Sequence, residues 1–319
     1  MSDAVEIGVK AAGVLAAFLL LPLLVGQLEH KAMAHMQSRV GPMYAGGFHG
    51  WAQLIADGVK FVQKEDVTPV AVDAPVYRLA PAVALLPYLL ALVVIPLGPG
   101  VVAASLDVGL LFALAIAGVG VVGMLMAAWA SSNKYSLIGG LRGAAQLLAY
   151  ELPLVLAAVS PAMAAGTLSL TGIVEAWQPW WLLWQAPAMV VFFVAGLAEL
   201  RRPPFDMPVA DSELVFGYLT EYSGLRFALF LLAEYAGIVV IAALTAVLFL
   251  GGWQGPFADQ LGPLWTLAKV FALSFVVIWF RVAFPRLRED QLQRLAWLVL
   301  VPIALGQLVL TGVVAVALA

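Results

Sequence analysis

The sequence predicts an all-α integral membrane protein with eight transmembrane helices, a cytoplasmic-side amphipathic helix and a long structured loop between helices five and six. Composition, the spacing of apolar windows and the distribution of basic residues support this prediction. Of the 319 residues, 63% are hydrophobic and 11% are charged, whereas soluble domains contain about 45–50% apolar and about 25% charged residues. A chain this apolar needs lipid to cover its surface.

Eight apolar windows approach the length of about 20 residues that spans the hydrocarbon core of a bilayer. Because backbone polar groups in lipid need partners within the segment, each window predicts a helix. The windows lie at about residues 7–28, 79–97, 108–130, 144–168, 181–199, 226–250, 263–282 and 296–318. No separate soluble domain is evident, so residues 1–319 are expected to form a single membrane domain.

Basic residues alternate between the inter-helix loops. Fourteen of the sixteen Lys and Arg residues fall in or beside four alternate loops, and the exceptions, Lys10 and Lys269, lie near helix ends. The positive-inside rule places these four loops in the cytoplasm. With an even number of crossings, both termini are then expected on the outer side.

The first cytoplasmic loop contains a predicted amphipathic helix over residues 48–64. Phe48, Trp51, Ile55 and Val59 recur at helical spacing, and polar residues such as Asp57 occupy the rest of the helical wheel. Such a helix can lie in the plane of the lipid headgroups. Docking on a partner protein explains the same pattern equally well, and both interpretations remain open.

The second long loop spans residues 199–226 and is rich in acids. Pro203 and Pro204 end the fifth helix, and residues 211–222 are expected to form a short helix. Apolar residues are mixed with the acids, which predicts a loop folded back against the helix ends rather than extended into solvent. The carboxylates of this segment are Glu199, Asp206, Asp211, Glu213 and Glu221.

Two further acids lie inside predicted membrane helices. Glu151 is about two turns from the cytoplasmic end of the fourth window, and Glu234 is about two turns into the sixth. An ionised carboxylate in hydrocarbon costs several kcal/mol, so such a residue faces a wet cavity, pairs with a cation or takes up a proton. These requirements fit a proton relay, and a structural hydrogen bond between helices is the competing interpretation.

The sequence also limits the chemistry expected of this chain. It contains no cysteine, and its three histidines, His30, His35 and His49, lack the spacing of a metal site. We therefore expect no metal site, and the absence of a basic tail or patch argues against nucleic-acid binding.

Several motifs together resemble a known family. They are SELVFGYLTEYSGLRFALFLLAEYA (212–236), AELRRPPFDMP (198–208), QSRVGP (37–42), LRGAAQLLAYEL (141–152) and FPRLREDQL (284–292). These stretches resemble the H subunit of bacterial NADH-quinone oxidoreductase, the counterpart of mitochondrial NADH dehydrogenase subunit 1. The resemblance covers nearly the whole chain.

The resemblance implies a multi-pass subunit of respiratory complex I in the bacterial inner membrane. It implies a chamber for quinone, either ubiquinone or menaquinone, and the start of an acidic path that couples quinone reduction to proton translocation. NADH, flavin and Fe–S clusters are expected on partner subunits: Fe–S subunits at the cytoplasmic face and small subunits in the membrane. The implied chamber residues are Arg39, Phe48, Trp51, Asp57, Arg202 and Phe205. The implied proton path uses Glu199, Asp206, Asp211, Glu213, Glu221, Glu151 and Glu234.

The chain departs from the family pattern at three places in the acidic loop. Arg201 stands where the family usually has Asn, Val209 where it has an acid, and Asp211 where it has Glu. The missing acid at Val209 leaves one step of the implied path in question.

Two alternatives compete with the quinone enzyme: a membrane subunit of a hydrogenase-type or other donor-specific complex, and a secondary transporter. The full 212–224 stretch favours the quinone enzyme, and the chain lacks the inverted repeat typical of transporters.

Overall fold

A computed structural model of the chain describes residues 3–318, which contain helices and connecting segments but no β-strand. The longer helices are α1 (Asp3–Met36), α3 (Ala74–Val94), α4 (Gly109–Ala130), α5 (Lys134–Ala165), α8 (Ala186–Glu199), α10 (Gly224–Phe249), α11 (Ala258–Ala283) and α13 (Val301–Leu318). The shorter ones are α2 (Gln53–Gln63), α6 (Leu170–Ala176), α7 (Trp181–Trp184), α9 (Asp211–Leu214) and α12 (Glu289–Leu295). Short 3₁₀ turns occupy Phe48–Gly50 and Gly217–Leu219.

Seven helical segments in the described part of the chain are long and apolar enough to cross a membrane. They fall where seven of the eight apolar windows predict them. The remaining window, residues 181–199, is divided at Gln185 into α7 and the fourteen-residue helix α8, with Pro187 in the first turn of α8. Proline is well suited to that position because its missing N–H would have no partner there.

Two helices extend beyond their apolar windows. Helix α1 continues to Met36, and α5 begins at Lys134, where the Asn133 side chain accepts a hydrogen bond of 2.8 Å from the backbone N–H of Tyr135. Hydropathy detects only the part of a helix that crosses hydrocarbon, so polar extensions escape it. Because the two helices extend this far, Glu29 belongs to α1 and Glu151 lies near the middle of α5.

The predicted helix over residues 211–222 is wrong beyond Leu214. Val215 adopts a φ of 64°, a conformation that β-branched residues rarely take, and ends α9. The chain then turns back so that Tyr218 and Tyr222 pack in a buried cluster with Tyr77 and Phe230. Burial of these rings outweighs the local preference for helix.

The predicted helix over residues 48–64 forms only in part. Its first turn is a 3₁₀ turn with His49 at a φ of 55°, and α2 then runs from Gln53 to Gln63. Gly46 and Gly50 also have positive φ, and the backbone of Gly50 packs so closely on Pro42 that a side chain there would clash. This turn sets the start of α2 beside α1, where Gln27 Nε2 donates to the carbonyl of Gly50 at 3.2 Å.

The C-terminal crossing is continuous but changes its hydrogen-bond register. Between α12 and α13, Ala296–Leu300 form a π-helical turn in which the N–H of Val301 donates to the carbonyl of Ala296. Pro302 follows at once, and a proline ring clashes with the carbonyl four residues earlier in a regular helix. The wider turn accommodates that ring within the membrane segment.

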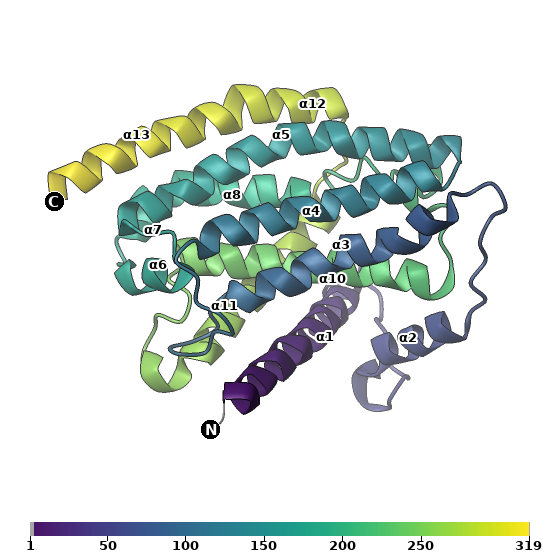
Figure 1. Cartoon of the computed structure of the whole chain (residues 1–319), viewed down its shortest axis with the longest axis horizontal. Coiled ribbons are helices and arrows are strands. Elements are labelled where there is room, and N and C mark those ends of the chain that lie inside the picture. The colour runs from purple at the N-terminus through teal and green to yellow at the C-terminus, as the bar shows by residue number, and fades with distance from the viewer. Residues whose placement is uncertain (1–2, 319) are drawn as a thin grey trace.

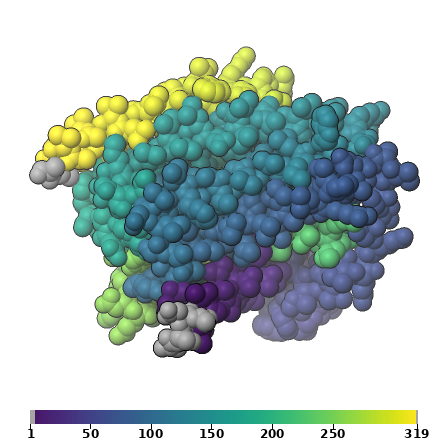
Figure 2. Space-filling model, viewed as in Figure 1, coloured from purple at the N-terminus to yellow at the C-terminus, as the bar shows by residue number. Residues whose placement is uncertain are grey.

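The bundle packs around α10, whose residues from Ala236 to Phe249 are all buried. Helices α3, α11, α1, α8 and α5 pack against it, and α1 and α13 lie at opposite edges of the bundle and are mostly exposed (Figure 1). In the space-filling view α13 forms a ridge along the upper edge (Figure 2). These exposed apolar helix surfaces are those that lipid or neighbouring membrane subunits would cover.

The two ends of the bundle differ in character. One end carries α2 and the segment 200–223, and we call it the acidic end. The other carries α6, α7 and the segment 95–108, and the first turns of α1 and the last turns of α13 point toward it (Figure 1); we call it the terminal end.

Candidate functional site

Four charged side chains form an ion network at the acidic end. Arg202 Nη1 lies 2.6 Å from Glu29 Oε2, and Arg202 Nη2 lies 3.3 Å from Glu29 Oε1. The Nε of Arg202 also donates to Oε1 of Glu234 in α10, and Nη1 of Arg281 in α11 donates to Oε1 of Glu29. The network therefore joins three helices to the acidic loop and balances two negative charges with two positive ones.

Burial makes this network a strong constraint on the fold. The Glu29 side chain is 1% exposed and that of Arg202 is 2% exposed. The ring of Tyr235 lies 4.8 Å from the guanidinium carbon of Arg202 and adds a cation–π contact. An isolated charge at such a depth would be several kcal/mol unfavourable, so each member depends on the others.

The network forms one wall of a polar cavity of about 200 Å³. The cavity lies between the acidic loop, α10 and the end of α11, and both charged and aromatic side chains line it. The lining includes Arg201, Arg202, Asp206, Val209, Asp211, Phe216, Tyr218, Phe227, Glu234, Tyr235 and Arg281. Four of the predicted site residues (Arg202, Asp206, Asp211 and Glu234) therefore meet at one cavity.

Asp206 is an acid of this cavity whose pKa is strongly shifted. Burial, opposed by the charge of Arg286 and assisted by those of Asp211 and Glu234, raises the pKa of its carboxyl to about 7. Arg286 Nη2 lies 3.4 Å from Asp206 Oδ2 and donates to the Asp206 backbone carbonyl at 2.5 Å. Asp206 can therefore exchange a proton near neutral pH.

Glu213 lies on the solvent-exposed side of the same loop, and neighbouring arginines stabilise its ionised form. Arg142 of α5 donates to Glu213 Oε2 at 2.6 Å, and this hydrogen bond and charge lower the pKa of Glu213. Arg286 lies 3.9 Å from its other oxygen, so one arginine lies close to both Asp206 and Glu213.

The remaining loop acids lie at the surface of the acidic end. Asp211 is exposed at the start of α9. Glu221 accepts a hydrogen bond of 2.5 Å from Nδ2 of Asn133, and its backbone carbonyl accepts one of 2.6 Å from Tyr77 Oη. Glu221 therefore ties the loop to the beginning of α5 and to α3.

Glu199 and Glu151 share a second, smaller cavity of about 150 Å³ between α4, α5 and α10. Glu199 is 5% exposed, and its Oε1 has no hydrogen-bond partner among the described residues. Glu151 is exposed on the side of the bundle, and an apolar lining surrounds both carboxyls. The two acids thus connect the interior of the bundle to its lateral surface.

Arg201 lies between the two cavities. It lines the larger one, and its charge acts on Glu199 and on the buried hydroxyl of Tyr150, which line the smaller one. Its guanidinium carbon lies 5.8 Å from the ring centre of Tyr218. Arg201 therefore carries a positive charge that acts on both Glu234 and Glu199.

The structure does not bring the other predicted chamber residues to the larger cavity. Arg39 is exposed and donates to Gln37 at 2.8 Å, and Asp57 accepts from Gln53 at 3.0 Å on α2. Phe48 is 82% exposed and Trp51 is also exposed, so both present apolar surface at the acidic end. Phe205 is buried in the main core, and its carbonyl accepts a hydrogen bond of 2.8 Å from Gln146.

Sequence reasoning missed three members of the site: Glu29, Arg281 and Arg201. Glu29 follows the first apolar window directly, which placed it in a loop, and Arg281 lies at the end of the seventh window. A usable signal was present, because each is a charged residue within one helical turn of an apolar window. The partners themselves are distant in sequence: Glu29 is 173 positions from Arg202 and 252 from Arg281.

The arrangement is suited to holding charge and moving protons. Among residues 3–318, no group of three or more His, Asp and Glu side chains is placed to hold a metal ion. What the acidic end offers is a polar cavity, a carboxyl that titrates near pH 7 and two further acids leading into the bundle.

Comparisons with known proteins agree with these features. A family model described as NADH dehydrogenase matches residues 9–312. A protein of Geobacillus kaustophilus, named as the H subunit of NADH-quinone oxidoreductase, is 46% identical over 289 residues, which cover 90% of this chain and 87% of the relative. Proteins of the same name from Bacillus cytotoxicus and Geobacillus thermodenitrificans are 46% and 45% identical over the same coverage.

Proposed function

Because the chain belongs to the H-subunit family of NADH-quinone oxidoreductase, whose members are components of a membrane oxidoreductase complex, we propose that it admits quinone to that complex. In this proposal it also forms the first part of the acidic path that couples quinone reduction to proton translocation. The protein crosses the bacterial inner membrane eight times, with α8 as the short fifth crossing and both termini on the outer side. The acidic end then faces the cytoplasm.

The observation that carries the proposal is the buried network of Glu29, Arg202, Glu234 and Arg281 beside the 200 Å³ cavity. A quinone consists of a long apolar tail and a small polar head. The exposed apolar residues Phe48 and Trp51 beside α1 offer an apolar approach at headgroup depth. The arginines of the network offer hydrogen-bond donors at the polar end.

Proton transfer follows from the order of the acids. Reduction of a quinone to a quinol takes up two protons, and Asp206, which titrates near pH 7, lies on the cavity that would hold or adjoin the headgroup. A change of charge there acts on Glu234 across the cavity, and Arg201 links this change electrostatically to Glu199 and then Glu151. Asp211, Glu213 and Glu221 form the cytoplasmic rim of this path. Because position 209 is Val, Asp206 and Asp211 are the carboxylates that the acidic loop contributes to the lining of the larger cavity.

The electrons come from other subunits in this proposal. NADH, flavin and Fe–S clusters belong to partner subunits that dock on the acidic end, and α2 lies between those partners and the lipid headgroups. Small membrane subunits cover the lateral opening at Glu151. The names of the relatives favour the quinone enzyme over a hydrogenase-type complex, and quinone-reductase activity of the isolated complex distinguishes the two.

The test is Glu213→Gln in the assembled complex. Gln keeps the shape of the side chain but removes the charge that Arg142 and Arg286 meet. We expect quinone-linked proton pumping in inverted membrane vesicles to fall while the complex still assembles. Glu175→Gln, an exposed acid at the terminal end, is the matched control and is expected to pump normally. Full pumping by the Glu213 variant would remove Glu213 from the path.

A further inference from the structure

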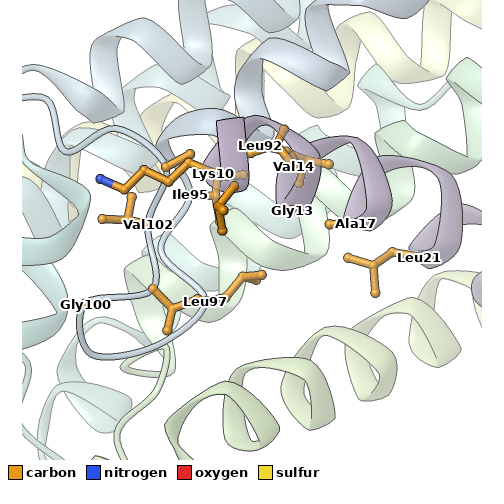
Figure 3. Close-up of a pocket in the computed structure, with 13 residues that line it drawn as sticks. Lys10, Gly13, Val14, Ala17, Leu21, Leu92, Ile95, Leu97, Gly100 and Val102 are labelled. Atoms are coloured by element: carbon orange, nitrogen blue, oxygen red, sulfur yellow. The ribbon is translucent and has the colours of Figure 1, made fainter. Parts of the chain in front are cut away.

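A second type of cavity lies at the terminal end, far from the acidic loop. It has a volume of about 310 Å³ and lies between the first half of α1, the last turn of α3 and the segment 97–103 (Figure 3). Its walls are almost wholly apolar and include Val14, Leu21, Leu92 and Ile95. The proposed function uses none of these residues.

The position of the cavity between two membrane helices indicates that it opens toward lipid. It is formed by two membrane-crossing helices close to the ends at which they leave the bilayer, and α1 is the least buried of the seven long crossings in the described part of the chain. The mouth therefore opens toward lipid at the depth where headgroups meet acyl chains. Because a water molecule occupies about 30 Å³ and a methylene group is of similar size, the cavity accommodates about ten chain carbons.

A pair of opposite charges stands at the mouth. Lys10 is the one charged side chain among the described residues that line the cavity, and its Nζ lies 2.9 Å from Oε1 of Glu6, one helical turn nearer the chain start. Both side chains are about half exposed. A cation and an anion one turn apart complement a headgroup that itself carries a phosphate and an ammonium group.

We propose that this cavity is a binding site for one zwitterionic phospholipid of the phosphatidylethanolamine type. One acyl chain fills the cavity, Lys10 donates to the lipid phosphate, and the lipid ammonium donates to Glu6. Gly13 lines the cavity, and a Cβ added there would meet no atom within 4 Å, so the absence of a side chain at this position keeps the space open.

The experiment compares two glycine variants of α1 in the complete complex. An added Cβ meets nothing within 4 Å at either Gly13 or Gly8, but only Gly13 lines the cavity. Gly13→Leu therefore fills the cavity, and Gly8→Leu adds the same bulk and the same helix propensity elsewhere. Each complex is reconstituted into vesicles of equal parts phosphatidylethanolamine and phosphatidylglycerol, extracted in detergent, and its retained lipid is measured by native mass spectrometry.

We expect wild type and Gly8→Leu to retain phosphatidylethanolamine, and Gly13→Leu to retain roughly tenfold less, equivalent to about 1.4 kcal/mol. Glu6→Gln, an exposed change that leaves the cavity open, should abolish the preference for phosphatidylethanolamine over phosphatidylglycerol, because both lipids carry the phosphate and only phosphatidylethanolamine carries the ammonium that Glu6 binds. This variant also carries the test if Gly13→Leu fails to assemble.

Three results would overturn the proposal. Gly13→Leu could retain as much lipid as Gly8→Leu, or wild type could retain phosphatidylglycerol equally well. A photo-crosslinking residue at position 13 could also label a protein segment instead of lipid, which would assign the cavity to a neighbouring subunit. Since the site lies at the terminal end, these outcomes are independent of the pumping test on Glu213.

Discussion

At the acidic end, Glu29 and Arg202 are buried as ions; at the terminal end, Ser160, Gln185 and Thr311 are buried as neutral groups. Ser160 Oγ donates to Gln185 Oε1 at 2.7 Å and lies 2.8 Å from Thr311 Oγ1, which joins α5, the start of α8 and α13. Both clusters hold helices together inside an apolar bundle. Of the two, the ionic cluster is the one that borders a polar cavity containing a carboxyl with a strongly shifted pKa.

Hydrogen bonding separates the two ends further. Of the eight buried side-chain atoms without a partner among the described residues, six lie at the acidic end, including Oε1 of Glu199 and Nη1 of Arg201. At the terminal end even the charged Lys269 is fully satisfied, because its ammonium donates to the carbonyls of Leu250, Gly252 and Gln254 at 2.7–2.8 Å. Buried polar atoms without a partner therefore gather at the acidic end, whereas Nε1 of Trp184 is an exception at the terminal end.

The sharpest test of this contrast is Arg202→Met. Removing the arginine leaves Glu29 with only the half-exposed Arg281 and leaves Glu234 without its partner, a change expected to be destabilising by about 3–5 kcal/mol. We expect the subunit to be lost from the complex, measured by its amount in membranes and by quinone-reductase activity. Arg288→Met removes an arginine that is 81% exposed and should assemble normally.

A double variant identifies the cause of that loss. If the unpaired carboxylate of Glu29 is responsible, adding Glu29→Gln to Arg202→Met should restore part of the assembly. Normal assembly of the single Arg202 variant would show that the network is dispensable, and the distinction between the two ends would fail.

The next effect concerns pH. Asp206, with its pKa raised to about 7 by burial, is neutral below that pH and ionised above it. Ionisation of this buried carboxyl opposes folding, so its contribution to stability is full below about pH 4, where the unfolded chain also keeps the proton, and is lost as the pH rises to 7. Asp206→Asn mimics the neutral form at every pH, and its melting temperature should therefore exceed that of wild type by an amount that grows between about pH 4 and pH 7 and is constant above pH 7.

The rate of quinone reduction provides the second readout. We expect the wild-type rate to change with an apparent pKa near 7 and the Asp206→Asn rate to lack that step. Glu213→Gln should retain the step, because the pKa of Glu213 is lowered by Arg142 and its carboxyl is already ionised in this range. An unchanged profile in the Asp206 variant would assign the titration to another group.

The sequence predicts the crossings well because lipid imposes them. Apolar windows identify all seven long crossings, and charged residues inside or beside them, such as Glu234 and Arg202, draw attention to the site. The pairing of Glu29 with Arg202 and Arg281 lies beyond such reasoning, since it depends on how helices distant in sequence pack. The course of the segment 200–223 escapes it too, because the burial of Tyr218 and Tyr222 overrides local helix propensity.

The smallest expected effect belongs to the terminal end, in Thr311→Val. The change keeps the branched shape and removes the hydroxyl that Ser160 and Gln185 contact, and interhelical hydrogen bonds of this kind contribute about 0.6 kcal/mol in membranes. We expect a slightly lower melting temperature and unchanged proton pumping. Thr245→Val is the matched control, since Thr245 donates only to Ile241 within its own helix. If Thr311→Val instead reduced proton pumping as much as Glu213→Gln, the neutral cluster of Ser160, Gln185 and Thr311 would also take part in pumping. Unpaired buried polar atoms would then no longer distinguish the end of the molecule that pumps protons.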